Sequence, residues 1–160
     1  MKKTLIILII LISNNSFSQK IKVKGNWRKT FSISDIKGAG SDYNEYYLSK
    51  MNQTKLSVSS ANSEKQENLY ADFKIYVSKD DDVWNSNLII QVRRTSNGKN
   101  NNLNIFSGTE FQTITDSPIY FFNTIGKQKN IHIQYKVIGL SVLLPAKSYS
   151  TVIIFTVLDL

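Results

Sequence analysis

The stretch IHIQYKVIGLSVLL, residues 131–144, decides the fold class of this chain. Apolar and polar residues alternate as far as Val137, and after Gly139 the apolar set moves by one position, to Leu140, Val142 and Leu144. Alternation with period two predicts an extended strand with one buried face. A shift of one position predicts an extra residue in the strand, so we expect Gly139 to form a β-bulge or a bend.

The same alternation recurs along the chain and predicts an all-β fold. Polar clusters separate the runs, and within one of them Asn97-Gly98 supplies the residues of a tight hairpin turn. No window shows a helical period. The other strands that we expect cover residues 21–33, 71–77, 88–92, 110–115, 119–122 and 151–158. The stretch 131–144 counts as two further strands, one on each side of Gly139. Together these runs predict one immunoglobulin-like β-sandwich of about eight strands.

The N-terminus has the layout of a secretory signal peptide. Lys2 and Lys3 precede the apolar run Leu5–Ile12, and a short polar stretch with Ser16 and Ser18 follows. The apolar run is too short for a membrane-spanning helix, which needs roughly 20 residues. We therefore predict a signal peptide over residues 1–18, no transmembrane anchor after cleavage, and a β-sandwich domain over residues 19–160. The predicted location is secreted, periplasmic or at the outer cell surface.

Composition excludes several classes of site. The chain contains no cysteine, so disulfides, thiol catalysis, cysteine-bound metals and an N-terminal lipid anchor are excluded. Its formal net charge of +8 becomes +6 once Lys2 and Lys3 are removed with the signal peptide. A basic protein outside the cytoplasm is attracted to anionic polysaccharides or lipid head groups rather than to nucleic acid. Because most lysines stand singly, solubilising surface charge also explains the excess.

The turn at residues 144–151, which leads into the last strand, resembles the closing segment of bacterial immunoglobulin-like sandwiches. The chain is most similar to small secreted pilin-like proteins of the spore coat U type, through Trp27, Trp84, Ser34-Asp35-Ile36, residues 39–43 and Arg93-Arg94-Thr95. The resemblance implies a sandwich that assembles on the cell surface with a chaperone and an outer-membrane pore. The chain lacks the cysteines common in that family.

Assembly is also suggested by the residues themselves. Strand addition needs an exposed N-terminal segment with alternate apolar side chains. Residues 21–33 have that pattern: Ile21 and Val23 are apolar, and Gly25 permits close approach of a neighbouring chain. The other interpretation is that this segment is simply the first strand of its own domain.

Candidates for catalysis and for metal binding are few. His132 is the only histidine, and one histidine without cysteine cannot supply a zinc site. The run Asp80, Asp81 and Asp82 offers oxygen ligands for calcium, although it also suits a solvated turn that ends a strand. We predict no enzymatic activity and no cofactor.

Carbohydrate binding has a physical basis in the aromatic residues, because sugars stack on exposed rings. Trp84 lies between acidic and amide residues, and Tyr43, Tyr46 and Tyr47 form a second cluster. We expect an exported, non-enzymatic structural subunit or adhesin whose partners are identical subunits or surface polysaccharide. The alternative is a monomeric glycan-binding module.

Overall fold

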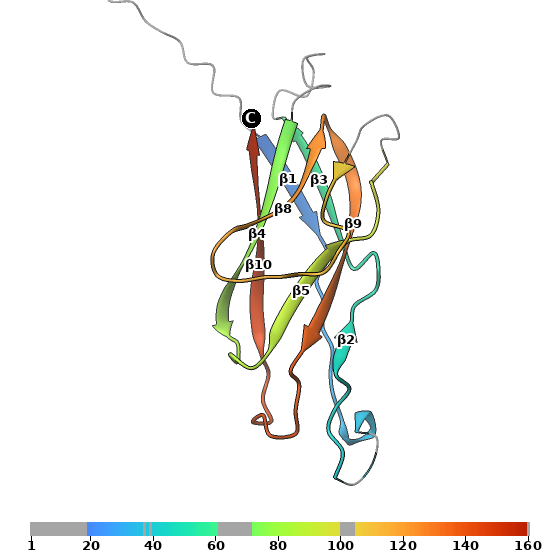
Figure 1. Ribbon diagram of the computed structural model, residues 1–160, viewed down its shortest axis with the longest axis vertical. Helices are drawn as coiled ribbons and strands as arrows, with labels where there is room; N and C mark the ends of the chain where they lie inside the picture. The colour runs from blue at the N-terminus through green and yellow to red at the C-terminus, as the bar shows by residue number, and fades with distance from the viewer. Residues whose placement is uncertain (1–18, 37, 39, 61–71, 100–104, 160) are drawn as a thin grey trace, which may run out of the picture.

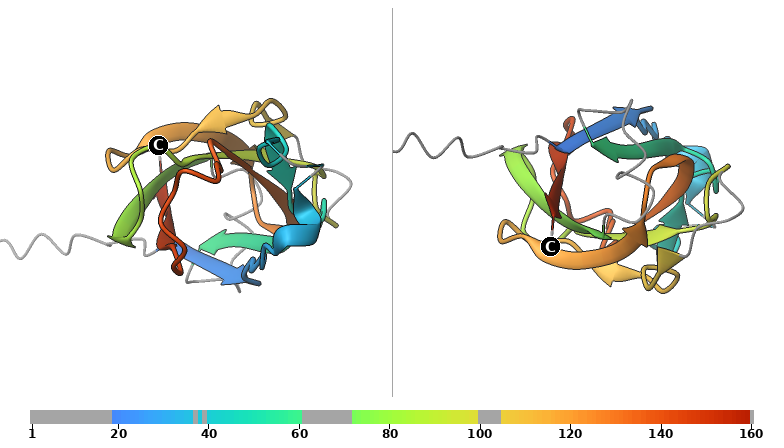
Figure 2. Two further views of the ribbon diagram at one scale, coloured as in Figure 1. Left: turned by 90° about the horizontal axis from the view of Figure 1, so that it is seen from below. Right: turned by 90° about the horizontal axis from the view of Figure 1, so that it is seen from above.

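The computed structural model describes residues 19–36, 38, 40–60, 72–99 and 105–159. Within them the chain forms two antiparallel sheets that pack face to face (Figures 1 and 2), which confirms the predicted all-β sandwich. The predicted signal peptide lies outside the described residues. No helix in the described part of the chain has the length and apolar character needed to span a membrane.

One sheet has six strands in the order β1-β3-β9-β5-β7, and β2 pairs with β9 as well. Its strands are β1 (Gln19–Lys24), β2 (Tyr46–Leu48), β3 (Thr54–Ser60), β5 (Ile89–Arg94), β7 (Gln112–Thr113) and β9 (Gln128–Ile138). The other sheet has the order β10-β4-β8-β6. Its strands are β4 (Asp72–Val83), β6 (Ile105–Phe106), β8 (Ile119–Ile125) and β10 (Ser150–Asp159).

The core lies between the sheets and is built by alternate residues of the long strands. Phe73 and Ile75 of β4 and Ile131 and Ile133 of β9 are fully buried, as the period-two pattern predicts. Phe121 and Phe122 of β8 are also buried and pack edge to face, with 5.1 Å between their ring centroids. Burial of these side chains is the main favourable term that holds the two sheets together.

The first and last strands are edge strands that lie side by side. β1 borders the six-stranded sheet, β10 borders the four-stranded sheet, and the two approach each other (Figure 2). Gln19 begins β1 and Asp159 ends β10 at the same end of the sandwich (Figure 1). The connection between β9 and β10 lies at the opposite end.

Strand β9 ends at Ile138 and the chain turns at Gly139 before it enters the other sheet, so the predicted bend is confirmed and the alternative, a bulged strand that continues to Leu144, is wrong. Gly139 has φ +88°, and a Cβ atom there would lie 2.0 Å from the Asn87 carbonyl oxygen. Residues 140–149 form a loop instead of a strand. Val142 is 50% exposed and Leu143 is 89% exposed, so the apolar alternation of this stretch reflects loop residues and not a buried face.

The first strand is shorter than predicted. β1 ends at Lys24 because Gly25 turns the chain with φ +115°, and its Cα lies close to the carbonyl group of Gln53. A short 3₁₀ helix, η1 (Ile33–Asp35), occupies part of the range that we expected to be strand. The alternation after residue 25 therefore belongs to an irregular segment.

Two turn predictions also need correction. Gly98 has the expected positive φ of +81°, but β5 and β6 on either side of it belong to different sheets and form no hairpin. Asp80, Asp81 and Asp82 lie inside β4, which continues to Val83, and do not form a turn.

Strands β2, β3 and β6 fall outside the ranges expected from the sequence.

We predict that Gly25→Ala destabilises the fold more than Gly40→Ala does. Both glycines have positive φ, but a Cβ at Gly25 would lie 2.3 Å from the Gln53 oxygen, whereas none of the described residues other than the chain neighbours lies within 4 Å of a Cβ at Gly40. Backbone strain alone costs about 1 kcal/mol, and the added clash raises the cost at Gly25 to roughly 2–3 kcal/mol. Urea unfolding measures both values, and equal losses of unfolding free energy would contradict the close approach.

Candidate functional site

A groove of about 1060 Å³ opens at the end of the sandwich where β9 connects to β10. The left panel of Figure 2 looks onto this end. Three segments form most of its wall: residues 26–31 after β1, the turn between β4 and β5, and the loop between β9 and β10. The volume is slightly above the roughly 300–1,000 Å³ typical of ligand pockets.

Tyr135 is the buried aromatic residue of the groove, and the half-buried Trp27 packs against it. Their rings are stacked at an interplanar angle of 9°, with 6.4 Å between centroids. The Tyr135 hydroxyl lies 3.2 Å from the Thr54 hydroxyl, and burial raises the pKa of Tyr135 above its usual value of 10. Tyr135 is therefore a neutral, fixed support for the Trp27 ring.

Trp84, in the turn between β4 and β5, also lines the groove. Its indole Nε1 donates a hydrogen bond of 2.7 Å to the Leu88 carbonyl oxygen, and the half-buried ring packs against the core. The Asn87 amide donates to the Asn85 side chain at 2.9 Å and so orders the same turn. These contacts hold the Trp84 ring in place before any ligand binds.

The tyrosine cluster predicted from the sequence is divided by the structure. Tyr43 and Tyr47 both pack edge to face against Phe31, at centroid distances of 5.8 and 4.6 Å. Tyr46 is 49% exposed, and its ring lies under the Lys136 ammonium, outside the groove. Neighbouring residues of a strand point to opposite faces, which explains why Tyr46 and Tyr47 separate.

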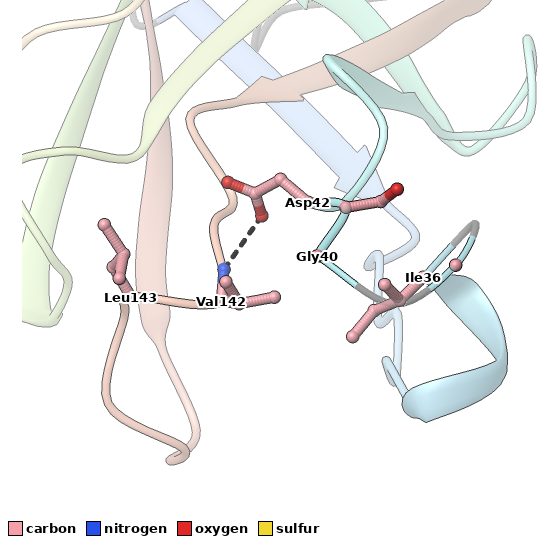
Figure 3. A pocket seen from close by; sticks show the side chains of 7 residues that line it. Ile36, Gly40, Asp42, Val142 and Leu143 are labelled. Atoms are coloured by element: carbon pink, nitrogen blue, oxygen red, sulfur yellow. Dashed lines mark hydrogen bonds between the residues drawn. The ribbon is translucent and has the colours of Figure 1, made fainter.

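Asp42 joins the segment before β2 to the loop between β9 and β10. Its carboxylate accepts hydrogen bonds from the Ser141 hydroxyl at 2.7 Å and from the Val142 amide at 2.8 Å. Figure 3 shows the hydrogen bond between Asp42 and the Val142 amide, beside a hollow that Ile36, Gly40 and Val142 help to line. Ser141, followed by the backbone amides of Tyr43 and Val142, lowers the pKa of Asp42 below its usual 3.8.

The groove is basic at its rim. Arg28, Lys29 and Lys147 line it, and none of the described lining residues is Asp or Glu. The Lys29 ammonium lies 3.5 Å from the Asp35 carboxylate, which partly offsets its charge. The Lys147 ammonium lies 5.3 Å from the ring centroid of Tyr149. The rim therefore combines aromatic faces with cations.

The structure brings together two sequence candidates that are far apart in the chain. Trp84 and Tyr43 line the same groove, whereas Ile21 and Val23 belong to β1 and pair with β3 of the same chain. Sequence reasoning missed Phe31 and Tyr149 as groove residues. Trp27, which the period-two pattern places on the apolar face of the strand expected at residues 21–33, both packs against the core and lines the groove. Trp27 and Phe31 follow Gly25 on a segment that we expected to be strand.

Neither the aspartate run nor the histidine forms a reactive centre in the described structure. Asp80 and Asp81 are neighbours in strand β4, opposite Val152 and Thr151, so their side chains point to opposite faces. The described residues contain no group of three or more His, Asp or Glu that could hold a metal ion. His132 lies opposite Lys55 on β3, and it does not line the groove.

We predict that the Asp42 contact is lost in acid. A carboxyl group with a lowered pKa in the folded state stabilises the fold above its unfolded pKa, and that contribution disappears as the pH falls through the lowered value. The Val142 amide resonance should therefore titrate with a midpoint below 3.8. In Asp42→Asn this titration should be absent, whereas Asp116→Asn, a change at an exposed turn, should preserve it. A midpoint at or above 3.8 would contradict the hydrogen-bonded carboxylate.

No protein-family model, no curated protein and no solved structure matches this chain.

Proposed function

We propose that this protein is an exported, non-enzymatic β-sandwich that binds a glycan in the groove at the end of its two sheets. One observation carries the proposal: Trp27, Trp84, Tyr43 and Tyr149, from separate segments of the chain, line one open groove. Aromatic faces held in fixed positions are the usual means of binding the apolar faces of sugar rings. The proposed export depends on the signal-peptide layout of residues 1–18.

The polar residues of the groove also suit a sugar. Asn26, Arg28, Thr30 and Ser148 lie among the aromatic residues of the wall. Their amide, guanidinium and hydroxyl groups can bond to sugar hydroxyls while a ring stacks on a neighbouring aromatic face. A purely apolar ligand would leave these groups without partners in the bound state, which is costly.

Preorganisation supports a binding role. Trp84 is fixed by its bond to Leu88, and Trp27 is fixed by its stack on Tyr135. The Asp42 contacts hold the loop that forms one side of the groove. A site whose residues are already ordered loses less conformational entropy on binding.

A self-assembling structural subunit is the second candidate, and the observation that favours it is the position of β1. β1 is an edge strand with the alternate apolar residues Ile21 and Val23, and Val23 is 44% exposed. Within the chain β1 already pairs with β3 over six residues. Assembly by donation of β1 would require β1 to leave β3 and pair with a neighbouring molecule.

We predict that Tyr149→Ala and Trp84→Ala each weaken binding of a neutral oligosaccharide about ten-fold, because each change removes a ring on which a sugar stacks. Isothermal titration calorimetry against a panel of neutral oligosaccharides measures the effect. Tyr149 is the cleaner test, because Trp84 also packs against the core.

Tyr46→Ala is the matched control, because Tyr46 is a half-exposed tyrosine outside the groove and should leave the affinity unchanged. Circular dichroism and thermal unfolding show whether each variant remains folded. Equal losses for Tyr46→Ala and Tyr149→Ala, or binding by no member of the panel, would overturn the groove as a glycan site.

We predict that the protein elutes as a monomer in size-exclusion chromatography with light scattering, because β1 completes its own sheet. Ile21 and Val58 are direct partners in the register, and the chain has no other cysteine, so a disulfide between Ile21→Cys and Val58→Cys would lock β1 in place. We expect the locked and unlocked proteins to be identical in size. If the unlocked protein forms a ladder of oligomers and the locked variant does not, assembly by strand addition would be established instead.

A further inference from the structure

The two sheets differ sharply in charge. Among the strands that the structure describes, those of the six-stranded sheet contain no Asp or Glu. Their basic residues are Lys20, Lys22, Lys24, Lys55, Arg93, Arg94, Lys129 and Lys136. In contrast, β4 and β10 of the other sheet contain five aspartates, Asp72, Asp80, Asp81, Asp82 and Asp159, and only two lysines, Lys74 and Lys79. The moderate net charge of the chain therefore conceals a concentrated basic surface.

The densest part of that surface is formed by β1 and β3. Lys20, Lys22 and Lys24 occupy alternate positions of β1, so they share one face at intervals of about 6.7 Å. In the register Lys24 lies opposite Lys55, while Ser57 and Ser59 lie opposite the other two lysines. All four lysines are exposed. We call these four lysines and two serines the lysine face.

The lysine face is on the solvent side of the sheet. Ile21, between the lysines, packs against the core, and Leu56 and Val58 of β3 are fully buried. The alternate residues must then point outward. Lys24 opposite Lys55 is a cross-strand pair of like charges, which destabilises a sheet when no counter-ion is present. An anion bound along this face would remove that repulsion.

We propose that the lysine face binds an anionic polysaccharide, with the sugar chain lying along β1 and its acidic groups paired with successive lysines. A linear acidic polysaccharide repeats its charge at regular intervals, as the lysines of β1 do. Flexible ammonium groups act as point charges and tolerate an imperfect match in spacing. The hydroxyl groups of Ser57 and Ser59 lie beside the lysines and can bond to sugar hydroxyls.

The composition of the face disfavours the two other polyanions. Membrane-surface binding commonly adds aromatic anchors to basic residues, and binding of single-stranded nucleic acid adds aromatic platforms for bases. The lysine face has no aromatic residue, and both tryptophans line the groove. Its only polar partners are hydroxyl groups, which suit a carbohydrate.

The proposal is independent of the function proposed for the groove. The lysine face is on the outer side of the six-stranded sheet, whereas the groove is at one end of the sandwich, and the two share no residue. A neutral sugar tests the groove, and an acidic chain tests the face. Either site can therefore fail without the other.

The experiment compares polygalacturonate with its methyl-esterified form, which keeps the sugar backbone but removes the charge. We expect the wild-type protein to bind the acidic polymer more tightly than the esterified one, and the affinity for the acidic polymer should fall steeply as salt is added. The triple variant Lys20→Gln, Lys22→Gln, Lys24→Gln should lose about ten- to hundred-fold in affinity and show a weaker salt dependence. Calorimetry or affinity electrophoresis measures both quantities.

A second triple variant, Lys50→Gln, Lys74→Gln, Lys99→Gln, removes the same charge from scattered positions and should retain most of the affinity. Equal losses in the two triple variants would overturn the lysine face in favour of net charge. Equal affinity for the acidic and the esterified polymer would also overturn it. So would a protein that binds phosphatidylglycerol vesicles or single-stranded DNA but does not bind polygalacturonate. Urea unfolding checks that each variant is folded.

Discussion

Backbone pairing along both edges of β9 is the constraint on which the rest of the structure depends. β3 and β2 pair in succession along one edge of β9, and β5 pairs along the other. The side chains of Ile131, Ile133 and Tyr135 on the inner face then meet the opposite sheet. Because β9 ends where Gly139 approaches Asn87, the following loop begins beside the turn that carries Trp84. Strand β9 thus positions two walls of the groove, namely the loop between β9 and β10 and the turn that carries Trp84.

The strands that can be predicted from the sequence are those in which burial and alternation coincide. In β4, β5 and β10 apolar residues face the core at every second position, and the approximate ranges of β5 and β10 are predicted correctly, whereas β4 begins near the expected residue but continues to Val83. β3 is missed because Leu56 and Val58 are its only apolar residues among serines, threonine and lysine. Residues 140–149 produce the opposite error, because their apolar side chains line an open groove or face solvent. Alternation of apolar and polar residues therefore indicates a buried face only where the backbone is paired in a sheet.

The candidate site can be predicted only in part. Trp84 and Tyr43 are recognisable as candidate binding residues, but no local pattern shows that loops from opposite sheets bring them to one groove. An extended strand through Trp27 would place its ring in the core, but the turn at Gly25 ends that strand and carries Trp27 into the groove wall. The lysine face is missed for another reason. Lys55 becomes part of the row on β1 only through the pairing of β1 with β3.

The positions of Gln19 and Asp159 have a practical consequence. Both lie at the end of the sandwich remote from the connection between β9 and β10. A tag, a fused domain or a solid support joined at either residue would hold the molecule with its aromatic opening directed away from the attachment point. Immobilised protein would then present that opening to a passing ligand without steric interference from the linker.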